Sequence, residues 1–223
     1  MRWKARNPNP SHVARHTLIV ACTGSGKSTL LLSGEVMKID RSLRVVGYDD
    51  VGTLPGLYYS SRAGFLRALK SGLSKQGFRI FYGGTKTPSD YMWFCEVVWS
   101  ILDGDKETVV LTEELASVSS SSGKAEGPQL VLLNEGRKYG AVCVNTCQKT
   151  TEISKTVVSQ SRVWFCGQQA VTDAAKSAAV VNVRESDIKA LRIGEFYRYA
   201  GGPDPGVLVR PKLREKSGVK WMD

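Results

Sequence analysis

Residues 21–29 read ACTGSGKST, and this stretch decides how the rest of the chain is interpreted. The apolar run TLIV (17–20) precedes it and LLL (30–32) follows it, so a glycine-rich turn joins a short buried strand to a helix. Because Gly24 and Gly26 have no side chain, backbone N–H groups can close around an anion there, and the helix N-terminus adds partial positive charge. The pattern predicts a loop that holds the phosphates of a nucleoside triphosphate.

Each position of this loop has an expected role. Lys27 can reach the outer phosphates and Ser28 can ligate Mg²⁺, which makes ATP and Mg²⁺ the expected ligands. Ala21 stands where glycine is usual, and we expect it to be tolerated because this position does not approach the phosphates closely. The residues expected to contact the nucleotide are Thr23, Gly24, Ser25, Gly26, Lys27, Ser28 and Thr29.

Composition indicates a globular chain with an anionic partner. The 223 residues suit one compact domain, and 42% are hydrophobic and 23% charged. A net charge of +10 favours nucleic acid as the partner, then an acidic membrane surface, although a basic surface without a partner is also compatible.

Two features that the sequence lacks narrow the class of protein further. No apolar run approaches the roughly 20 residues of a membrane helix, and the N-terminus lacks the apolar core of a signal peptide. We therefore expect no integral membrane segment. The five cysteines include no Cys-x-x-Cys pair, which favours buried reduced thiols and a cytosolic setting.

Apolar runs and helical patterns alternate along the chain. Expected strands cover 16–21, 43–50, 78–83, 107–116, 141–148 and 161–167; expected helices cover 27–37, 61–73, 88–102 and 128–140. Such alternation predicts an α/β fold with a mainly parallel central sheet and helices on both faces. The chain divides into a basic N-terminal extension (1–16), a core (17–200) and a basic C-terminal tail (201–223).

Acids follow two of the expected strands. Glu113 and Glu114 come after the apolar run 109–111, and adjacent residues at a strand end point in opposite directions. One could face the metal while the other faces the γ-phosphate. Asp49 and Asp50 form an alternative pair, for which a turn or cap role is the competing interpretation. We prefer the glutamates, because a further strand between the loop strand and the acid strand is the arrangement in which a catalytic glutamate is common.

Two more polar residues are candidates for the catalytic site. Gln148 ends an expected strand, at the edge where ligands bind in such sheets, and could contact the attacking water or cap the next turn. Arg137 precedes that strand and could stabilise charge in a neighbouring subunit's site or lie on the surface.

The chain contains three informative stretches, HTLIVACTGSGKS, VVLTEELA and LLNEGRKYGAVCVNTCQKTTEISKTVVSQ. Together they resemble the FtsK–HerA superfamily of DNA-pumping ATPases. Within it, the chain is most similar to the small genome-packaging ATPases of tailless, often membrane-containing viruses. The resemblance covers about residues 10–200. It implies a RecA-like (ASCE-type) P-loop NTPase that forms a hexameric ring and moves double-stranded DNA through its pore.

By position, the resemblance assigns Glu113 to the metal-associated acid, Glu114 to the catalytic glutamate and Gln148 to the sensor glutamine. Arg137 matches an arginine that acts across the subunit interface. The metal-associated acid is usually Asp, so the longer Glu113 leaves the division of roles between the two glutamates open. Thr112 is polar where an apolar residue is usual.

The expected function is ATP-driven packaging of a viral genome into a preformed capsid. The expected partners are double-stranded DNA without sequence preference and a capsid vertex or viral membrane protein; the expected locations are host cytoplasm and virion. The Ser-rich loop 117–127 lines the pore with Lys124 or is simply solvated. The alternatives are a DNA export or conjugation ATPase and, in a different class, a P-loop kinase for a small substrate.

Overall fold

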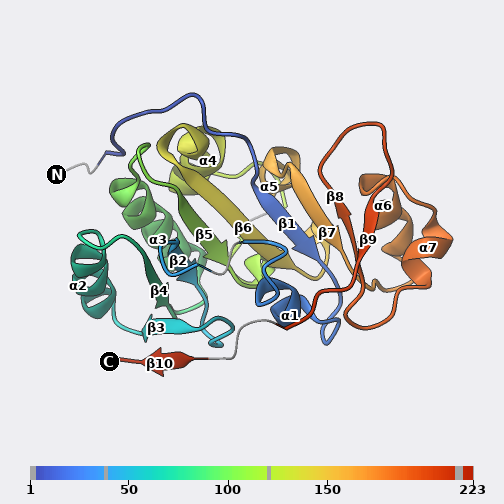
Figure 1. Cartoon of the computed structure of the whole chain (residues 1–223), viewed down its shortest axis with the longest axis horizontal. Coiled ribbons are helices and arrows are strands. Elements are labelled where there is room, and N and C mark those ends of the chain that lie inside the picture. The colour runs from blue at the N-terminus through green and yellow to red at the C-terminus, as the bar shows by residue number, and fades with distance from the viewer. Residues whose placement is uncertain (1–3, 38–39, 120–121, 214–217, 223) are drawn as a thin grey trace.

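The computed structural model describes residues 4–37, 40–119, 122–213 and 218–222, and one ten-stranded sheet runs through these residues (Figure 1). The strands are β1 (Thr17–Val20), β2 (Arg44–Tyr48), β3 (Gly56–Tyr59), β4 (Phe78–Tyr82), β5 (Thr108–Thr112), β6 (Ala141–Cys147), β7 (Val163–Cys166), β8 (Phe196–Tyr199), β9 (Val207–Val209) and β10 (Val219–Trp221).

The sheet has the order β10-β3-β4-β2-β5-β6-β1-β7-β8-β9. Every pair from β10 to β7 is parallel, whereas β8 and β9 add on in antiparallel fashion. The fold class predicted from the sequence, a mainly parallel RecA-like α/β sheet, is therefore confirmed. Strand β6 lies between β1 and β5, so one strand separates the glycine-rich loop from the strand that carries the two glutamates.

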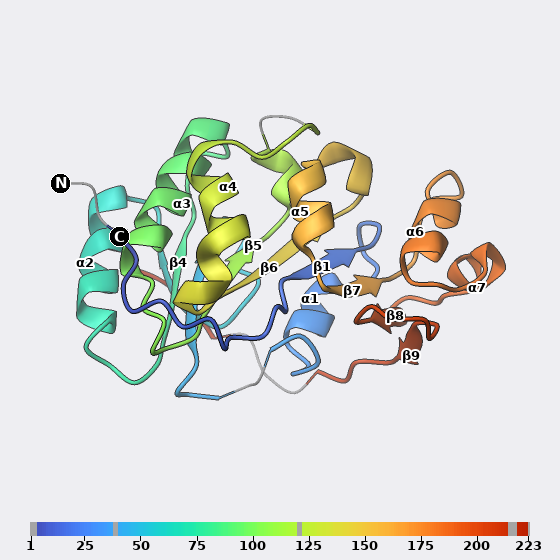
Figure 2. The same cartoon turned by 90° about the horizontal axis from the view of Figure 1, so that it is seen from above.

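Helices cover the two faces of the sheet unequally. They are α1 (Lys27–Leu31), α2 (Arg62–Gly72), α3 (Pro88–Ile101), α4 (Gly127–Glu135), α5 (Lys155–Gln160), α6 (Ala174–Val180) and α7 (Glu185–Lys189), with short 3₁₀ turns at Leu115–Ser117, Gly136–Tyr139 and Thr150–Glu152. Figure 2 shows α3, α4 and α5 on one face and α1 on the other.

The strands read as apolar runs because side chains alternate between two buried layers. Leu18 and Val20 pack in the larger core under α2 to α5, and Ile19 between them packs in the smaller core with Leu30 and Phe165. None of the helices in the described ranges is both long and apolar enough to cross a bilayer. All five cysteines are free thiols, four of them buried, as expected.

Two expected elements differ from the structure. The helix expected over 27–37 ends at Leu31, and Gly34 then adopts a left-handed conformation (φ 85°), which breaks a helix. The sequence from about residue 194 onward suggests one or two short strands around a Gly-Pro turn, whereas the structure has three there, since β8, β9 and β10 all join the sheet. The division into 1–16, 17–200 and 201–223 stays a prediction.

Candidate active site

The glycine-rich loop connects β1 to α1 at the carboxyl edge of the parallel strands. Gly24 (φ 78°) and Gly26 (φ 93°) both have positive φ, which favours glycine. The Ala21 N–H donates to the Cys147 carbonyl (3.2 Å), so the first loop residue is fixed to β6. A Cβ at Gly167 would lie 2.9 Å from the Ala21 methyl, which shows that this methyl fills space against a glycine.

Two side chains inside the loop are suited to an anion. The Lys27 ammonium donates to the carbonyls of Ala21 (2.8 Å) and Cys22 (3.2 Å), so it lies over the loop itself. The Ser25 hydroxyl is buried and has no hydrogen-bond partner among the described residues. A loop with left-handed glycines, a positive charge and an unsatisfied hydroxyl fits a bound phosphate group.

The two glutamates lie where β5 ends, and hydrogen bonds from both neighbouring strands hold them. The Glu113 N–H donates to the Tyr48 carbonyl (3.0 Å) of β2, and the Glu114 N–H donates to the Thr146 hydroxyl (2.8 Å) of β6. The Thr146 hydroxyl in turn donates to the Glu113 carboxylate (3.2 Å). One threonine thus positions both acids, and sequence reasoning did not identify it because a threonine inside a strand is unremarkable.

Glu114 has an unusual backbone conformation. Its φ of 48° and ψ of 64° place it in the left-handed region, where residues other than glycine and asparagine are uncommon. The strain ends β5 sharply, and the Glu114 carbonyl then accepts from the Ser117 N–H (3.0 Å) and hydroxyl (2.8 Å). A residue held in such a conformation at a strand end is typical of a functional site.

The electrostatics connect the acids to the loop. Burial and the negative charge of Asp49 raise the pKa of Glu113 to about 7, while the Thr146 hydrogen bond and the Lys27 charge oppose that rise. Because Lys27 acts on Glu113 through space, the structure brings the loop cation and the β5 acid together. A positive ligand between them would favour the ionised carboxylate.

A divalent cation fits this arrangement. Mg²⁺ commonly takes one or two protein oxygens and completes its shell with phosphate oxygens and water. The Ser28 hydroxyl and the Glu113 carboxylate are the residues that could hold it. No cluster of three or more His, Cys, Asp or Glu side chains suited to a metal occurs in the ranges that the structure describes.

The alternative acids are engaged elsewhere. The Asp49 carboxylate accepts from the backbone N–H groups of residues 51 to 53 and from the Tyr58 hydroxyl (2.8 Å), which makes it the cap of a turn. Asp50 pairs with Lys86 (2.6 Å). These contacts leave Asp49 as a source of negative potential near Glu113, and the turn interpretation accounts for Asp49, whereas Asp50 forms an ion pair.

Gln148 follows β6 directly and is half-buried. The carbonyl of the preceding residue, Cys147, accepts a hydrogen bond from the Ala21 N–H. Gln148 therefore follows directly after the point where the glycine-rich loop is fixed to β6. The structure therefore places Gln148 at the same sheet edge as the loop and the glutamates.

Arg137 lies at the other end of β6, in the Gly136–Tyr139 turn. A seven-residue strand separates it from the loop of its own chain, a span of about 20 Å. Its Nη1 donates to the carbonyls of Pro10 (2.9 Å) and His12, so it holds the N-terminal segment against the turn. The structure does not bring Arg137 to the site formed by the other candidates.

The Ser-rich loop is partly anchored. Residues 120 and 121 of the expected loop 117–127 lie outside the described residues. The Gly123 carbonyl accepts from the Lys155 N–H (2.8 Å) and the Ala125 N–H donates to the Thr156 hydroxyl (2.9 Å), so this half is fixed to α5. Lys124 between them is exposed.

The sheet order, the loop and the acids together define a RecA-like P-loop NTPase. No family model matches the chain. Protein P9 of Pseudoalteromonas phage PM2 is 32% identical to it over 168 residues, which cover 74% of this chain and 73% of P9. The chain belongs to the family of protein P9.

Solved structures agree with this fold. The genome packaging NTPase B204 from Sulfolobus turreted icosahedral virus 2, in complex with ATP-γS, matches with a TM-score of 0.68 and 14% identity over 90% of this chain and 98% of B204. The bacterial conjugative coupling protein TrwB matches with a TM-score of 0.67 and 12% identity over 94% of this chain and 87% of TrwB. At these identities the likeness establishes the fold.

Proposed function

We propose that this protein hydrolyses ATP to move double-stranded DNA, and that it packages a viral genome into a preformed capsid. The observation that carries the proposal is the Thr146-bridged pair of glutamates, one strand away from the phosphate loop, in a chain of the P9 family. The B204 complexes with ATP-γS and AMPPCP support ATP as the ligand.

The proposed chemistry is an attack of water on the γ-phosphorus. Glu114 accepts a proton from the water, the bond from the γ-phosphorus to the β,γ-bridging oxygen breaks, and ADP and phosphate result. Lys27 and the loop N–H groups stabilise the negative charge that develops on the phosphate oxygens. Glu113 and Ser28 would hold Mg²⁺, which would neutralise phosphate charge, and Gln148 contacts the γ-phosphate or the water.

The proposed assembly is a homohexameric ring in which Arg137 serves the site of the neighbouring subunit. A role in its own site is unfavourable, because β6 separates Arg137 from its own loop. The ring docks on a capsid vertex or viral membrane protein, in the host cytoplasm and in the virion. The basic segments 1–16 and 201–223 flank the motor core.

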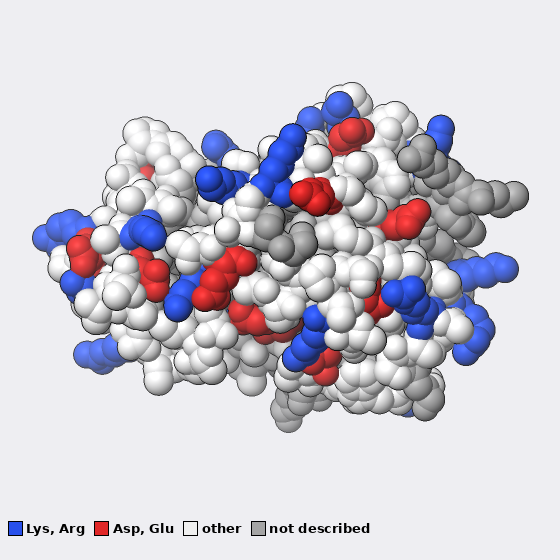
Figure 3. Space-filling model, turned by 180° about the vertical axis from the view of Figure 1, so that it is seen from behind, with Lys and Arg blue, Asp and Glu red and all other residues white. Residues whose placement is uncertain are grey.

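The net charge of +10 supports DNA as the partner. On the face shown in Figure 3, Lys and Arg side chains are interspersed with Asp and Glu. This mixed face does not have the continuous basic stripe that would follow a duplex on an isolated subunit. We therefore propose that the DNA-contacting surface forms in the assembled ring, with Lys124 beside the pore.

A turnover assay tests the proposal. We expect purified protein with Mg²⁺ to hydrolyse ATP slowly, and we expect double-stranded DNA of any sequence to stimulate turnover. The Lys27→Ala variant is the matched control and should lose both activities. ATP turnover that DNA does not change, together with ADP formed only when a small phosphate acceptor is present, would show a kinase and overturn the motor proposal.

DNA export or conjugation is the second candidate, because TrwB is a conjugative coupling protein with the same fold. Co-purification with capsid proteins separates the two. A packaging motor should bind empty capsids in the presence of ATP-γS, whereas a conjugation motor should not.

A further inference from the structure

The second half of the Ser-rich loop is joined to the start of α5 by two hydrogen bonds. The Lys155 N–H donates to the Gly123 carbonyl (2.8 Å), and the Ala125 N–H donates to the Thr156 hydroxyl (2.9 Å). Lys124 lies between the two bonds, and its side chain is exposed. We call these two bonds the loop clamp. The clamp fixes the cation of the loop relative to α5, although Ala125 and Thr156 are 31 positions apart in the sequence.

Both sides of the clamp are anchored in the larger core. Ala125 on the loop side and Val157 on the α5 side are buried there. The Ser154 side chain caps α5, because its hydroxyl accepts from the Val157 N–H (3.4 Å). Thr156 is also buried, so water competes little for the hydrogen bond between its hydroxyl and the Ala125 N–H. A shift of α5 is therefore passed on to Lys124.

A short link connects the start of α5 to Gln148. The link is formed by residues 149–154 and contains the 3₁₀ turn Thr150–Glu152. Ile153, which follows the turn, is buried in the larger core. A link that is this short and is anchored by a buried side chain is suited to carry a displacement of Gln148 to α5.

The link lies within electrostatic range of the acids and the phosphate loop. Burial and the charge of Glu114 raise the pKa of the Cys147 thiol. The Lys27 charge opposes that rise, and the Glu152 charge adds to it. Because Cys147 is affected by all three charges, the 3₁₀ turn that contains Glu152 is a neighbour of the nucleotide site.

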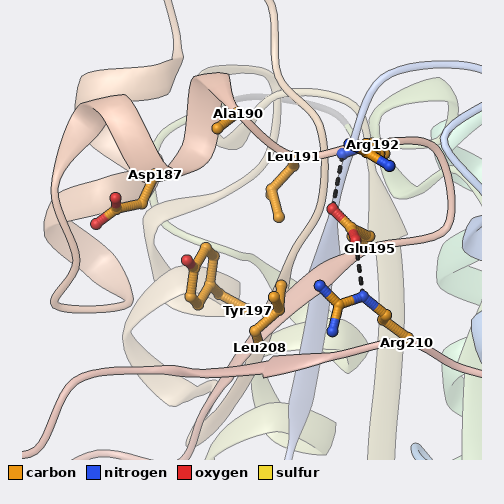
Figure 4. A pocket seen from close by; sticks show the side chains of 8 residues that line it. All are labelled: Asp187, Ala190, Leu191, Arg192, Glu195, Tyr197, Leu208 and Arg210. Carbon is orange, nitrogen blue, oxygen red and sulfur yellow. Dashed lines mark hydrogen bonds and ion pairs between the residues drawn. The ribbon is translucent and has the colours of Figure 1, made fainter.

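The other side of the phosphate loop lies away from the clamp. There the Gly194 N–H donates to the Ser25 carbonyl (3.0 Å). Figure 4 shows the Glu195 carboxylate next to Gly194, where it accepts from the Arg192 N–H (3.0 Å) and the Arg210 Nε (2.8 Å). In the sheet order, β7, β8 and β9 lie on the opposite side of β1 from β6 and β5. The shorter route from the phosphate loop to the Ser-rich loop therefore runs along the end of β6.

We propose that the loop clamp couples the state of the nucleotide to the contact with DNA. While Gln148 contacts the γ-phosphate, the link 149–154 and α5 hold one position, in which the clamp sets Lys124 against a DNA phosphate. After hydrolysis the contact of Gln148 is lost, α5 shifts and Lys124 withdraws. Thr156 and the Lys155 N–H are thus positioning groups that act through Lys124. The inference rests on the proposed function and identifies the part of the chain that links ATP hydrolysis to DNA movement.

Removal of the side-chain bond of the clamp is the first test. Thr156→Val keeps the size of the side chain but offers no acceptor to the Ala125 N–H. We expect DNA to stimulate its ATP turnover roughly 5-fold less than that of wild type, or weaker still, which is the lower end of the usual coupling between two sites. Turnover without DNA should stay close to that of wild type and reports an intact nucleotide site. Thr156→Ser keeps the hydroxyl and is the matched control, with the stimulation of wild type.

Removal of the backbone bond is the second test. Lys155 is the first residue of α5, a position where proline fits a helix, and Ser154 already has the extended backbone (φ −64°, ψ 142°) that a following proline requires. Lys155→Pro therefore removes the N–H and leaves α5 in place. We expect it to lose stimulation by DNA as Thr156→Val does. Lys155→Ala removes the same charge but keeps the N–H, and at saturating DNA it should be stimulated as wild type is.

Hydrogen exchange follows the coupling in a chain with an intact clamp. In wild type without DNA, saturating ATP-γS should change the exchange rates of the Ala125 and Lys155 amides, which are the two donors of the clamp. Gln148→Ala, measured at a concentration of ATP-γS that saturates it, should show no such change. If neither Thr156→Val nor Lys155→Pro folds, this measurement decides.

The outcomes separate the two proposals. Stimulation at the level of wild type in both Thr156→Val and Lys155→Pro would overturn the coupling role of the clamp and leave the motor proposal intact, and so would clamp amides whose exchange does not respond to ATP-γS. An equal loss in Lys155→Pro and Lys155→Ala, or in Thr156→Val and Thr156→Ser, would also overturn it, because the controls keep the clamp. A wild-type protein whose turnover does not respond to DNA would overturn the motor proposal itself.

Discussion

At the scale of single residues, the two glutamates after β5 have separable roles. Glu114→Gln removes the proposed proton acceptor and keeps the shape of the side chain. We expect it to bind ATP as wild type does and to lose turnover by roughly 100- to 10,000-fold, the usual contribution of a general base. Single-turnover kinetics and equilibrium ATP binding measure the two effects.

Glu113→Gln is the comparison for that experiment. It should raise the Mg²⁺ concentration needed for half-maximal turnover, because a metal ligand is weakened. If Glu114→Gln retains turnover while Glu113→Gln loses it at saturating Mg²⁺, the two roles are exchanged.

His16 makes stability depend on pH. It is buried, its Nδ1 accepts from the Cys143 N–H (3.0 Å), and burial together with the nearby Arg137 charge lowers its pKa to about 4. The unfolded chain binds the proton near pH 6.5, so this group's contribution is fully present above pH 6.5 and is lost as pH falls toward 4. The loss amounts to about 3 kcal/mol, from about 1.4 kcal/mol per pKa unit.

Urea unfolding at pH 7 and pH 5 measures this contribution. His16→Asn keeps an acceptor for the Cys143 N–H but has no titratable group, so the difference in unfolding free energy between the two pH values should shrink. An identical pH dependence in His16→Asn and wild type would contradict the expectation.

At the scale of elements, β6 separates Arg137 from the phosphate loop of the same subunit. In the proposed ring, Arg137 of one subunit meets the phosphate loop of its neighbour. If Arg137 acts in the neighbouring subunit, Arg137→Ala and Lys27→Ala should each be nearly inactive. An equal mixture should recover up to about a quarter of wild-type turnover, because one interface in four combines an intact loop with an intact arginine. The measurement is ATP turnover after the subunits have been mixed and assembled on DNA.

The control for mixing is Arg137→Ala combined with Arg137→Ala, Lys27→Ala, which offers no intact arginine and should not recover. Absence of recovery in the first mixture, when both variants fold and form mixed rings, would restrict Arg137 to its contacts with Pro10 and His12.

Sequence patterns predicted the helices and strands that are marked by a strong local pattern of apolar residues. The six expected strands match β1, β2, β4, β5, β6 and β7, because each is an apolar run between polar turns. The patterns missed β3 and predicted one or two strands after residue 194, where the structure has β8, β9 and β10. Strands β3 and β10 are short and pair with each other at the sheet edge from distant parts of the chain. The helix after the loop was predicted too long, because Gly34 ends it within an otherwise helical pattern.

The candidate site divides in the same way. The loop and the glutamates were identified because their residue types and spacing are informative without tertiary structure. Thr146 was not, because its significance depends on contacts with two residues far away in sequence, the Glu114 N–H and the Glu113 carboxylate.

At the scale of the whole molecule, the charge of +10 predicts how DNA binding depends on salt. A protein that neutralises six to ten phosphates loses roughly 10³- to 10⁵-fold in affinity between 50 and 200 mM salt. We expect a loss of this order in fluorescence anisotropy, with similar affinities for duplexes of unrelated sequence. A duplex preferred by a thousandfold at constant salt would contradict phosphate-based binding.

The position of β1 also has a consequence for the order of events during synthesis. Its two neighbours, β6 and β7, begin at residues 141 and 163, more than 120 residues after β1 itself. Strand β1 therefore has neither neighbour until β6 has been translated; the contact of Ala21 with Cys147 becomes available with β6, and the contact of Ser25 with Gly194 only after β7. Nascent chains that end before β6 and β7 carry the ACTGSGKST residues without the backbone contacts that shape them, so we expect such chains not to bind nucleotide.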